Sequence, residues 1–574
     1  MKGQRLLRRF PTLWRATRLA RRWYYARYDS YPDWQRVLQS NNSDVWRSAH
    51  HAAVGGPRVL MATAIGSLSH AVTLESALAA ALTFRGAEVH ALLCDGTMTA
   101  CAECEASLYP RIEHFAEHGP AGDLCRDCLW PAEQVYRQLG ITVHKYGDWL
   151  LPDDHAEAAR IAQSVPMREV RSFEHDGLAL GEHAWAGALR FFATGSLDEE
   201  PLAEPIVRRY LQSAMLTALA TRTLLRALRF SSTVVTHGIY IPWGIIAEVS
   251  RQEKVRVSTW NVAYRKRRFI FSHDDTYHHT LLHEPAEHWE HLQLSAEQEG
   301  ELMRYLHSRR EGLFDWIVFH RPSKQEPQDI ARTVGVDPGR PVIGLLTNVS
   351  WDAQLHYPAN AFPNMLEWLV QTCEYFASRP DLQLLIRVHP AEISGFPPSR
   401  QPILAELAQR VPRLAPNIHV VPPESQLSTY ALMSLCNAVI IYGTKTGVEL
   451  TSRSIPVIVA GEAWIRNKGI TFDASSPGEY FRILDDLPFS GPLDQQQTAR
   501  ARRYAYHFFF NRMIPLPFLE PRKGNGSYRL NLRTLRHLQP GASAGLDTIC
   551  RGILGQTPFL LQDTAPSPSE LVNS

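Results

Sequence analysis

The sequence predicts an α/β protein of two domains, each built around a mostly parallel sheet. Short apolar runs of strand length recur along the chain, and a polar or glycine-containing turn and then a segment of helical periodicity follow most of them. This alternation of strand and helix is typical of doubly wound sheets. A length of 574 residues fits two such domains.

The composition is that of a globular protein, with 45% hydrophobic and 21% charged residues and a net charge of +2. No stretch is long and apolar enough to span a bilayer, and no signal-peptide core follows the N-terminal charges. We therefore expect a cytoplasmic protein.

Basic and aromatic residues are concentrated in the N-terminal segment 1–50. Arginines alternate with apolar residues at helical spacing, which predicts either an amphipathic helix on an anionic membrane surface or a solvated helix packed on the body of the protein. The first reading places the protein peripherally, at the inner face of the cytoplasmic membrane. No groove-reading motif accompanies the charge, so we expect no nucleic-acid partner.

A strand at 58–65, a turn at 66–70, a helix at 72–85 and a strand at 88–93 predict the first βαβ unit of an N-terminal domain covering 51–335. Further along this domain the pattern predicts a long helix at 203–229, a strand at 232–236, a helix at 242–249 and a strand at 255–260.

An insert at 94–130 carries two cysteine pairs, Cys101-x2-Cys104 and Cys125-x2-Cys128. In a reducing cytoplasm such pairs favour a metal over disulfides. Four thiolates close a tetrahedral site, so we expect a structural zinc in a zinc-ribbon-like insert. An iron–sulfur cluster or unmetallated thiols are the alternatives.

The second domain, 336–520, shows five strands alternating with helices, and residues 521–574 form a C-terminal extension whose last twenty residues have a disordered composition. An aromatic helix at 499–510 is expected to return to the first domain. The strands are predicted at 342–348, 382–389, 418–422, 438–442 and 456–460.

Polar residues follow two strands of the second domain, where parallel sheets bind their ligands. Arg387 and His389 end one strand. Thr444, Lys445 and Thr446 lie in the turn after the strand at 438–442, at a helix start that favours a phosphate. We expect these residues to bind the phosphates of a nucleotide, with His389 stabilising the leaving phosphate.

Glu449 follows in the first turn of the same helix and is expected to accept from ribose hydroxyls, although the helix dipole alone also favours a carboxylate there.

Transfer from a nucleotide-activated donor needs a base for the acceptor hydroxyl. His237 ends a strand of the first domain and precedes a glycine, which makes it the first candidate. No Asp-x-Asp triplet occurs, so we expect no catalytic divalent metal. The rival bases are His70, Glu75, Glu182 and His183.

Five pieces of the chain together resemble bacterial capsule polysaccharide biosynthesis proteins, which are GT-B glycosyltransferases and include Kdo transferases. The pieces are THGIYIPWG, RRFIFSHDDTYH, LLTNVSWDAQ, RVHPAE and IYGTKTGVELTSRSIPVIVAGE.

More distantly the chain resembles CDP-glycerol glycerophosphotransferases and bacterial sialyltransferases. The resemblance implies that His389-Pro390 and the pair Thr444/Thr446 contact the nucleotide phosphate, and that His237 is the base. It covers about residues 230–470, and 58–95 only loosely.

These observations predict a GT-B fold, with two Rossmann-like domains facing a cleft. The expected activity is transfer of a sugar from a nucleotide-sugar donor to a growing surface or capsular polysaccharide, or to a lipid-linked acceptor. The alternatives are a CDP-glycerol-type glycerophosphotransferase and a non-catalytic nucleotide-binding adaptor of a polysaccharide export complex.

Overall fold

The computed structural model describes most of the chain. Described are residues 31–39, 42–109, 111–309, 315, 327–353, 358–395, 397–522 and 528–561, with eight more between 12 and 24. The predicted membrane-facing helix lies mostly outside these residues, as does the C-terminal end expected to be disordered. Within the described part of the chain, no helix is both long and apolar enough to cross a bilayer.

The first sheet has seven strands in the order β13-β6-β5-β4-β1-β2-β3. Strands β1 to β5 are parallel, and β6 and β13 join antiparallel at one edge. The order β3-β2-β1-β4-β5 is that of a Rossmann sheet and reverses between β1 and β4. The strands are β1 Arg58–Ala64, β2 Glu88–Leu93, β3 Thr142–Lys145, β4 Ser232–Thr236, β5 Arg256–Val262, β6 Arg268–His273 and β13 Ile514–Pro515.

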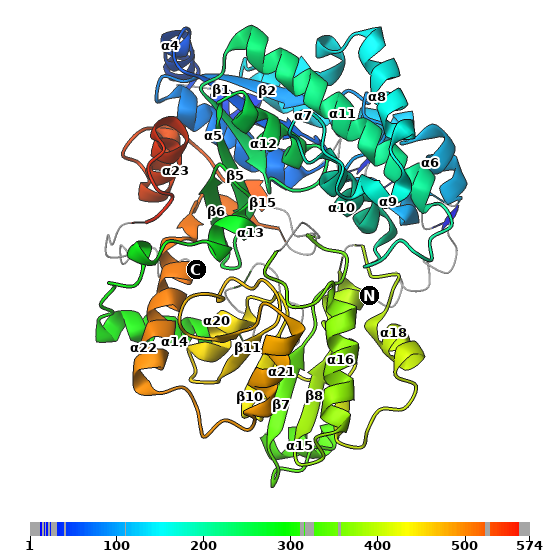
Figure 1. Ribbon diagram of the computed structural model, residues 1–574. Coiled ribbons are helices and arrows are strands. Elements are labelled where there is room, and N and C mark those ends of the chain that lie inside the picture. Colours follow the sequence, from blue (N-terminus) through cyan, green and yellow to red (C-terminus); the bar gives the residue numbers. More distant parts are fainter. Residues whose placement is uncertain are drawn as a thin grey trace.

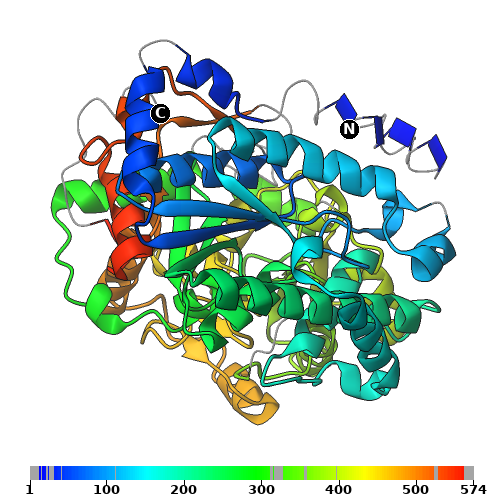
Figure 2. The ribbon, with the colours of Figure 1, turned by 90° about the horizontal axis from the view of Figure 1, so that it is seen from above.

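Helices cover both faces of this sheet and form two cores (Figures 1 and 2). Figure 2 shows the strands between α7 on one side and α11 on the other. Every residue of α5 from Ala71 to Thr83 is buried, because small and apolar residues surround its whole circumference. The main covering helices are α5 Ser69–Thr83, α7 Gly122–Gln138, α10 Leu180–Phe192, α11 Ala203–Leu228 and α12 Trp243–Gln252.

The second sheet has six parallel strands in the order β12-β11-β10-β7-β8-β9. Counted from β7, this is the full Rossmann order, and it reverses between β7 and β10. The strands are β7 Val342–Leu346, β8 Gln383–Arg387, β9 Ile418–Val421, β10 Ala438–Ile441, β11 Val457–Val459 and β12 Phe472–Asp473. Their covering helices are α16 Met365–Ala377, α18 Ile403–Arg410, α19 Thr429–Met433, α20 Thr446–Thr451 and α21 Pro477–Asp485.

The remaining elements connect or extend these two sheets. The helices are α3 Trp34–Leu38, α4 Asn42–Ala53, α6 Ile112–His118, α8 Pro152–Ser164, α9 Met167–Val170, α13 Tyr277–Leu282, α14 Ala296–Ser308, α15 Pro327–Val334, α17 Ala391–Ser394, α22 Gln495–Tyr506 and α23 Ala544–Gly555. Two short strands, β14 Leu519–Pro521 and β15 Tyr528–Leu530, pair with each other.

The chain returns to the first domain after the second sheet is complete. Helix α22 packs on α14 and α20, and β13 then joins β6. At the crossing the buried carboxylate of Glu284 pairs with His507 at 3.0 Å and with Arg512 at 3.2 Å. The predicted arrangement of two Rossmann-like sheets is confirmed.

The cysteine insert does not form a zinc ribbon. Over 94–109 and 111–130 the described backbone contains no strand, and Cys125 and Cys128 lie near the start of helix α7. The prediction of a ribbon-like insert is wrong, because the helical periodicity of α7 extends back through the second cysteine pair.

Candidate functional site

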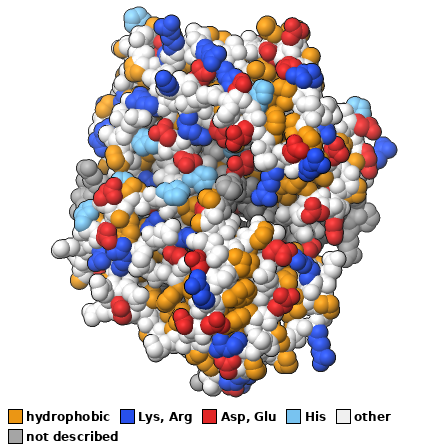
Figure 3. All heavy atoms as spheres, in the orientation of Figure 1, with side chains coloured by type: hydrophobic (Ala, Val, Ile, Leu, Met, Phe, Trp, Pro, Cys, Tyr) orange, Lys and Arg blue, Asp and Glu red, His pale blue; other side chains and the backbone are white. Residues whose placement is uncertain are grey.

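A cavity of about 1280 Å³ lies between the two sheets and is lined from both domains. Its walls are the segments that follow β1 and β4 in the first sheet and β7, β8 and β10 in the second. Both points at which the strand order reverses therefore open on the same cavity, where Rossmann sheets bind their ligands. On the face shown in Figure 3, histidines gather near the level where the two halves of the molecule meet.

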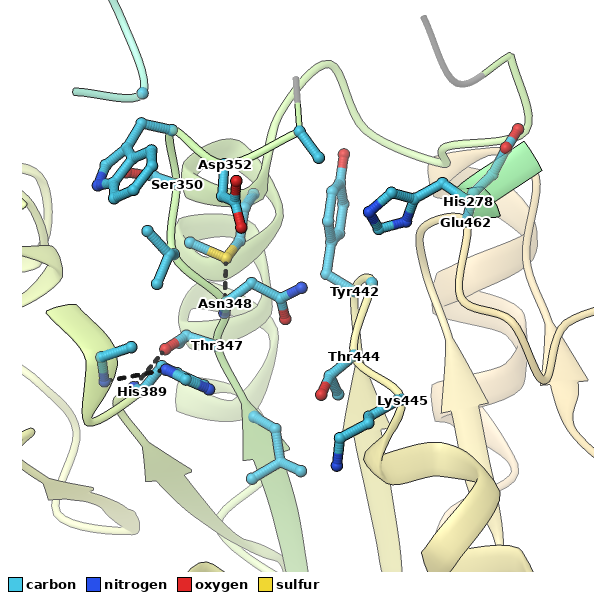
Figure 4. A pocket seen from close by; sticks show the side chains of 18 of the residues that line it. His278, Thr347, Asn348, Ser350, Asp352, His389, Tyr442, Thr444, Lys445 and Glu462 are labelled. Carbon is cyan, nitrogen blue, oxygen red and sulfur yellow. Dashed lines mark hydrogen bonds between the residues drawn. The ribbon is translucent and has the colours of Figure 1, made fainter. Parts of the chain in front are cut away.

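His389 lies on the wall formed by the second sheet, directly after β8 (Figure 4). Its backbone N–H donates to Thr347 Oγ1 at 3.0 Å, and its Nδ1 accepts from the backbone N–H of Ala391 at 3.1 Å. Because Nδ1 accepts, Nε2 carries the proton of the neutral ring. Burial, together with Lys445 and Arg387, lowers the pKa of His389 to about 4, so the ring is a neutral donor near pH 7.

The loop after β10 brings Thr444, Lys445 and Thr446 to the same wall. The hydroxyls of Thr444 and Thr446 lie 3.2 Å apart, so both are presented at one place. Gly443 lets the start of this loop lie close to Asn348, because a Cβ there would meet Asn348 Nδ2 at 3.3 Å. The structure thus brings His389, Thr444, Lys445 and Thr446 together as the sequence predicted.

The polar groups of two other residues predicted for this wall, Arg387 and Glu449, contact protein atoms. Arg387 is almost fully buried, and its guanidinium donates to the carbonyls of Pro422, at 2.5 Å, and Ser425, at 3.3 Å. The Glu449 carboxylate is 2.7 Å from Lys445 Nζ and 2.9 Å from Arg309 Nε, and Glu449 does not line the cavity. In this structure Glu449 contacts cations where the sequence led us to expect a ribose.

His237 lies on the opposite wall, directly after β4. Its ring edge packs against Trp243, with centroids 5.8 Å apart, and its buried Nδ1 has no hydrogen-bond partner within the described residues. Burial, with His70 and Arg190 nearby, lowers the pKa of His237 to about 3. The ring is therefore neutral and able to accept a proton.

The backbone that carries His237 is strained. His237 has φ +52°, Gly238 +72° and Tyr240 +63°, and left-handed conformations cost a non-glycine residue about 1–2 kcal/mol. A Cβ at Gly238 would also lie 2.9 Å from Thr259 Cγ2. Such strain persists where packing fixes the backbone, and it is common at functional sites.

The rival bases fall in different places. His70 lines the cavity, and burial lowers its pKa to about 4. His183 pairs with Glu248 at 2.9 Å between α10 and α12, away from the cavity. Glu75 is buried beneath the wall, where it accepts from Thr236 and Trp260, and Glu182 does not line the cavity.

Several lining residues were not singled out from the sequence. The hydroxyl of Tyr240, in the first domain, donates to Asp352 Oδ1, in the second, at 2.9 Å and accepts from the backbone N–H of Ala353 at 2.8 Å. Asn348 Oδ1 is buried without a hydrogen-bond partner within the described part of the chain. The motifs LLTNVSWDAQ and RRFIFSHDDTYH contain Asn348, Asp352 and His278, but only the packing of the two domains shows that all three line one cavity.

A second set of contacts joins the domains at the rim of the cavity. Gln401 Oε1 accepts from the backbone N–H of Gly195 at 2.9 Å, and Arg400 pairs with Glu200 at 2.9 Å. The backbone N–H of Arg400 donates to the carbonyl of Ala193 at 2.9 Å. The cavity is thus closed on this side by the segments around Gly195 and Gln401.

The cysteine pairs lie outside the cavity. In the insert, Cys101 Sγ and Cys104 Sγ are 3.8 Å apart, and Cys128 Sγ accepts from the backbone N–H of Ser67 at 3.2 Å. Among the described residues no three His, Cys, Asp or Glu side chains are arranged to hold a metal.

Comparison with known proteins gives similar structures but no matching sequence family. No family model matches the chain, and no curated protein matches it. Among solved structures it is similar to the Thermosulfurimonas dismutans KpsC β-Kdo 2,4-transferase, at 13% identity and TM-score 0.33 over 54% of this chain and 87% of the other.

The β-Kdo 2,7-transferase of the same organism is similar at 12% identity and TM-score 0.29, over 54% and 84%. The UDP-GlcNAc 2-epimerase of Neisseria meningitidis is similar at 11% identity and TM-score 0.23, over 78% and 97%.

Proposed function

We propose that the protein is a GT-B glycosyltransferase that transfers a sugar from a nucleotide-activated donor to an acceptor of a surface or capsular polysaccharide. The observation that carries the proposal is the shared cavity at both points of strand-order reversal. One wall presents hydrogen-bond donors and a cation, and the other presents a neutral imidazole.

The two walls divide the work of the transfer. The bond between the sugar's anomeric carbon and the donor phosphate breaks, and a bond from that carbon to the acceptor oxygen forms. Charge builds up on the leaving phosphate, where the Nε2–H of His389, the hydroxyls of Thr444 and Thr446 and the ammonium of Lys445 stabilise it. His237 takes the proton of the acceptor hydroxyl.

The proposed role of His237 requires a bound ligand. A pKa of about 3 makes the ring a weak base in the empty cavity. The negative charge of a donor phosphate bound across the cavity favours the protonated ring and raises this pKa. The base therefore gains strength when the donor is in place.

The test is incubation with CMP-, UDP-, GDP- and CDP-linked donors and an acceptor oligosaccharide, with the released nucleotide measured. Release of one nucleotide with growth of the acceptor is expected. Transfer of glycerol phosphate from CDP-glycerol would instead favour the glycerophosphotransferase. No release from any donor, by protein that binds no nucleotide, would contradict the proposal.

A structural zinc at the cysteine pairs is a further part of the proposal. In a tetrahedral site with Zn–S bonds of about 2.3 Å, neighbouring sulfurs lie about 3.8 Å apart. The two sulfurs of Cys101 and Cys104 have this spacing. Cys125 and Cys128 are three residues apart in α7, so both thiols project from one side of the helix. Closing the site requires the two pairs to approach each other.

Elemental analysis of the purified protein should find about one zinc per chain, and Cys104→Ser should lower it. Cys373→Ser, at a buried cysteine of the second domain, is the matched control and should leave the zinc content unchanged. Iron in place of zinc, or equal metal in both variants, would refute the zinc site. Brief treatment with EDTA should leave turnover intact, since we propose no catalytic metal.

A further inference from the structure

The wall of the cavity that carries His389, Thr444, Lys445 and Thr446 is called the donor wall, and the opposite wall with His237 the acceptor wall. A buried network of charges lies behind the donor wall and includes residues from outside the second sheet. Lys445 Nζ contacts Glu449 Oε1 at 2.7 Å, and Glu449 Oε2 accepts from Arg309 Nε at 2.9 Å. Arg309 also pairs with Asp315 at 2.5 Å. Arg309 follows helix α14, and Asp315 lies further along the connection between the two sheets.

Aromatic side chains enclose this network. The ammonium of Lys445 lies 4.4 Å from the ring centroid of Tyr264, which comes from the loop between β5 and β6. Arg309 donates to the hydroxyls of Tyr305 at 2.8 Å and Tyr430 at 3.1 Å. Three segments distant in the chain thus hold one lysine at the donor wall.

Burial makes this network necessary if Lys445 is to be charged. The Lys445 side chain is 14% exposed and that of Glu449 is 1% exposed. Burial, followed by Arg309, lowers the pKa of Lys445, whereas Glu449 and Asp315 raise it. Without the Glu449 charge, a buried ammonium beside Arg309 loses its proton more readily.

Lys445 also faces the group predicted to stabilise the leaving phosphate. Its charge is one of the causes that lower the pKa of His389, so the two side chains lie close enough to interact electrostatically. Both line the cavity, whereas Glu449 does not. Glu449 is therefore placed to act on a ligand only through Lys445.

We propose that Glu449 is a positioning residue that holds Lys445 charged and in place for the donor phosphate, with Arg309 and Asp315 completing the support. The inference rests on the proposed nucleotide site. It assigns Glu449 a role other than ribose contact, and it makes donor binding depend on the connection between the domains.

The experiment measures nucleotide affinity by titration calorimetry, with no turnover required. CMP, UDP, GDP and CDP are titrated into the full chain from about pH 7 to about pH 9, and the tightest ligand is kept. Lys445→Met should weaken it about tenfold or more at every pH, because a hydrogen bond to a charged group is lost.

Glu449→Gln should weaken binding progressively as the pH rises. An ammonium is charged below its pKa, and loss of the Glu449 charge lowers that pKa, so the fall in affinity should begin at a lower pH than in the wild type. The groups that face Lys445 and titrate or carry charge are Glu449, Arg309, Asp315, Tyr264 and His389.

Glu284→Gln is the matched control, because Glu284 is an equally buried carboxylate paired with Arg512 and His507. It should keep the wild-type pH profile even where it lowers stability. If Glu449→Gln does not fold, Glu449→Asp keeps the charge but withdraws it from Lys445 and should shift the profile in the same direction by less.

Wild-type affinity for Lys445→Met, or a Glu449 variant whose profile runs parallel to the wild type, would overturn the inference while leaving the nucleotide site intact. Wild-type protein that binds none of the four nucleotides would overturn the proposed function, and the inference with it.

Discussion

Two fully buried glutamates show how the two walls of the cavity differ. Burial raises the pKa of each carboxyl. Beneath the acceptor wall, Glu75 accepts hydrogen bonds from hydroxyl and indole donors, and burial raises its pKa to about 7. Beneath the donor wall, Arg309 and Lys445 more than offset burial, and the pKa of Glu449 is lowered to about 2.

The difference extends to the residues that line each wall. On the acceptor side His70, His237 and His278 have pKa values lowered to about 4, 3 and 3, mainly by burial, so these rings are neutral. On the donor side Lys445 is held against an ionised carboxylate. A lysine on the donor side suits the binding of a phosphate, and neutral imidazoles on the acceptor side suit the acceptance of a proton.

The largest expected effect is that of His237→Asn. Asparagine tolerates a left-handed backbone, so the change should keep φ near +52° while removing the base. Turnover should fall about 10²- to 10⁴-fold, the usual contribution of a general base. Nucleotide affinity should stay within about twofold, since His237 lies on the acceptor wall.

The control for this change is His90→Asn, at a buried histidine of β2 that does not line the cavity. It should retain turnover. Full turnover in His237→Asn would move the base elsewhere, with His70 the next candidate, whereas loss of nucleotide affinity would contradict the division between the walls.

A smaller effect is expected on stability from Glu75→Gln. The folded pKa of about 7 lies above the ordinary value of 4.5, so the native state binds more protons than the unfolded state between these values. Wild-type stability therefore falls as pH rises through this window, by about 2–3 kcal/mol. Glutamine does not titrate and keeps the acceptor oxygen for Thr236 and Trp260.

Urea unfolding at about pH 5 and about pH 8 checks this prediction. The variant should gain about 2 kcal/mol relative to the wild type at the higher pH and little at the lower. An equal difference at both values would show that Glu75 is ionised in the native state, and the acceptor side would then not be neutral.

The smallest effect is expected from Tyr240→Phe, which removes the hydrogen bonds to Asp352 and Ala353 that join the two walls. Loss of such bonds costs about 1–2 kcal/mol, so the closed cavity should be less populated and kcat a few-fold lower. Tyr375→Phe is the matched control, because its hydroxyl donates to Asp485 at 2.8 Å within the second domain. Equal kcat values in the two variants would show that the contact between the walls is not used in turnover.

The alternation of strand and helix was predictable from the sequence because several central strands, such as β7, β10 and β11, are continuous apolar runs. The predicted helix at 203–229 is observed at 203–228, and the predicted strand at 58–65 at 58–64. His389, Thr444 and Lys445 could be placed together from the sequence because the carboxyl ends of parallel strands lie at one edge of the sheet.

Contacts between distant segments were not predictable. The partner of Glu449 is Arg309, 140 residues earlier, and no local pattern joins them. The contact between Tyr240 and Asp352 depends on how the two sheets face each other. In the cysteine insert, the spacing of the pairs suggested a ribbon. The second pair instead lies in helix α7, which extends from Gly122 to Gln138.

The central claim is that the donor nucleotide lies on the wall of the second sheet and its sugar points toward His237. A crystal structure with the tightest-binding nucleotide tests it most directly. The account predicts phosphate oxygens within hydrogen-bond distance of His389 Nε2 and Lys445 Nζ, between the segments that follow β7 and β10. A nucleotide bound with its phosphates against His237, or outside the cavity, would contradict it.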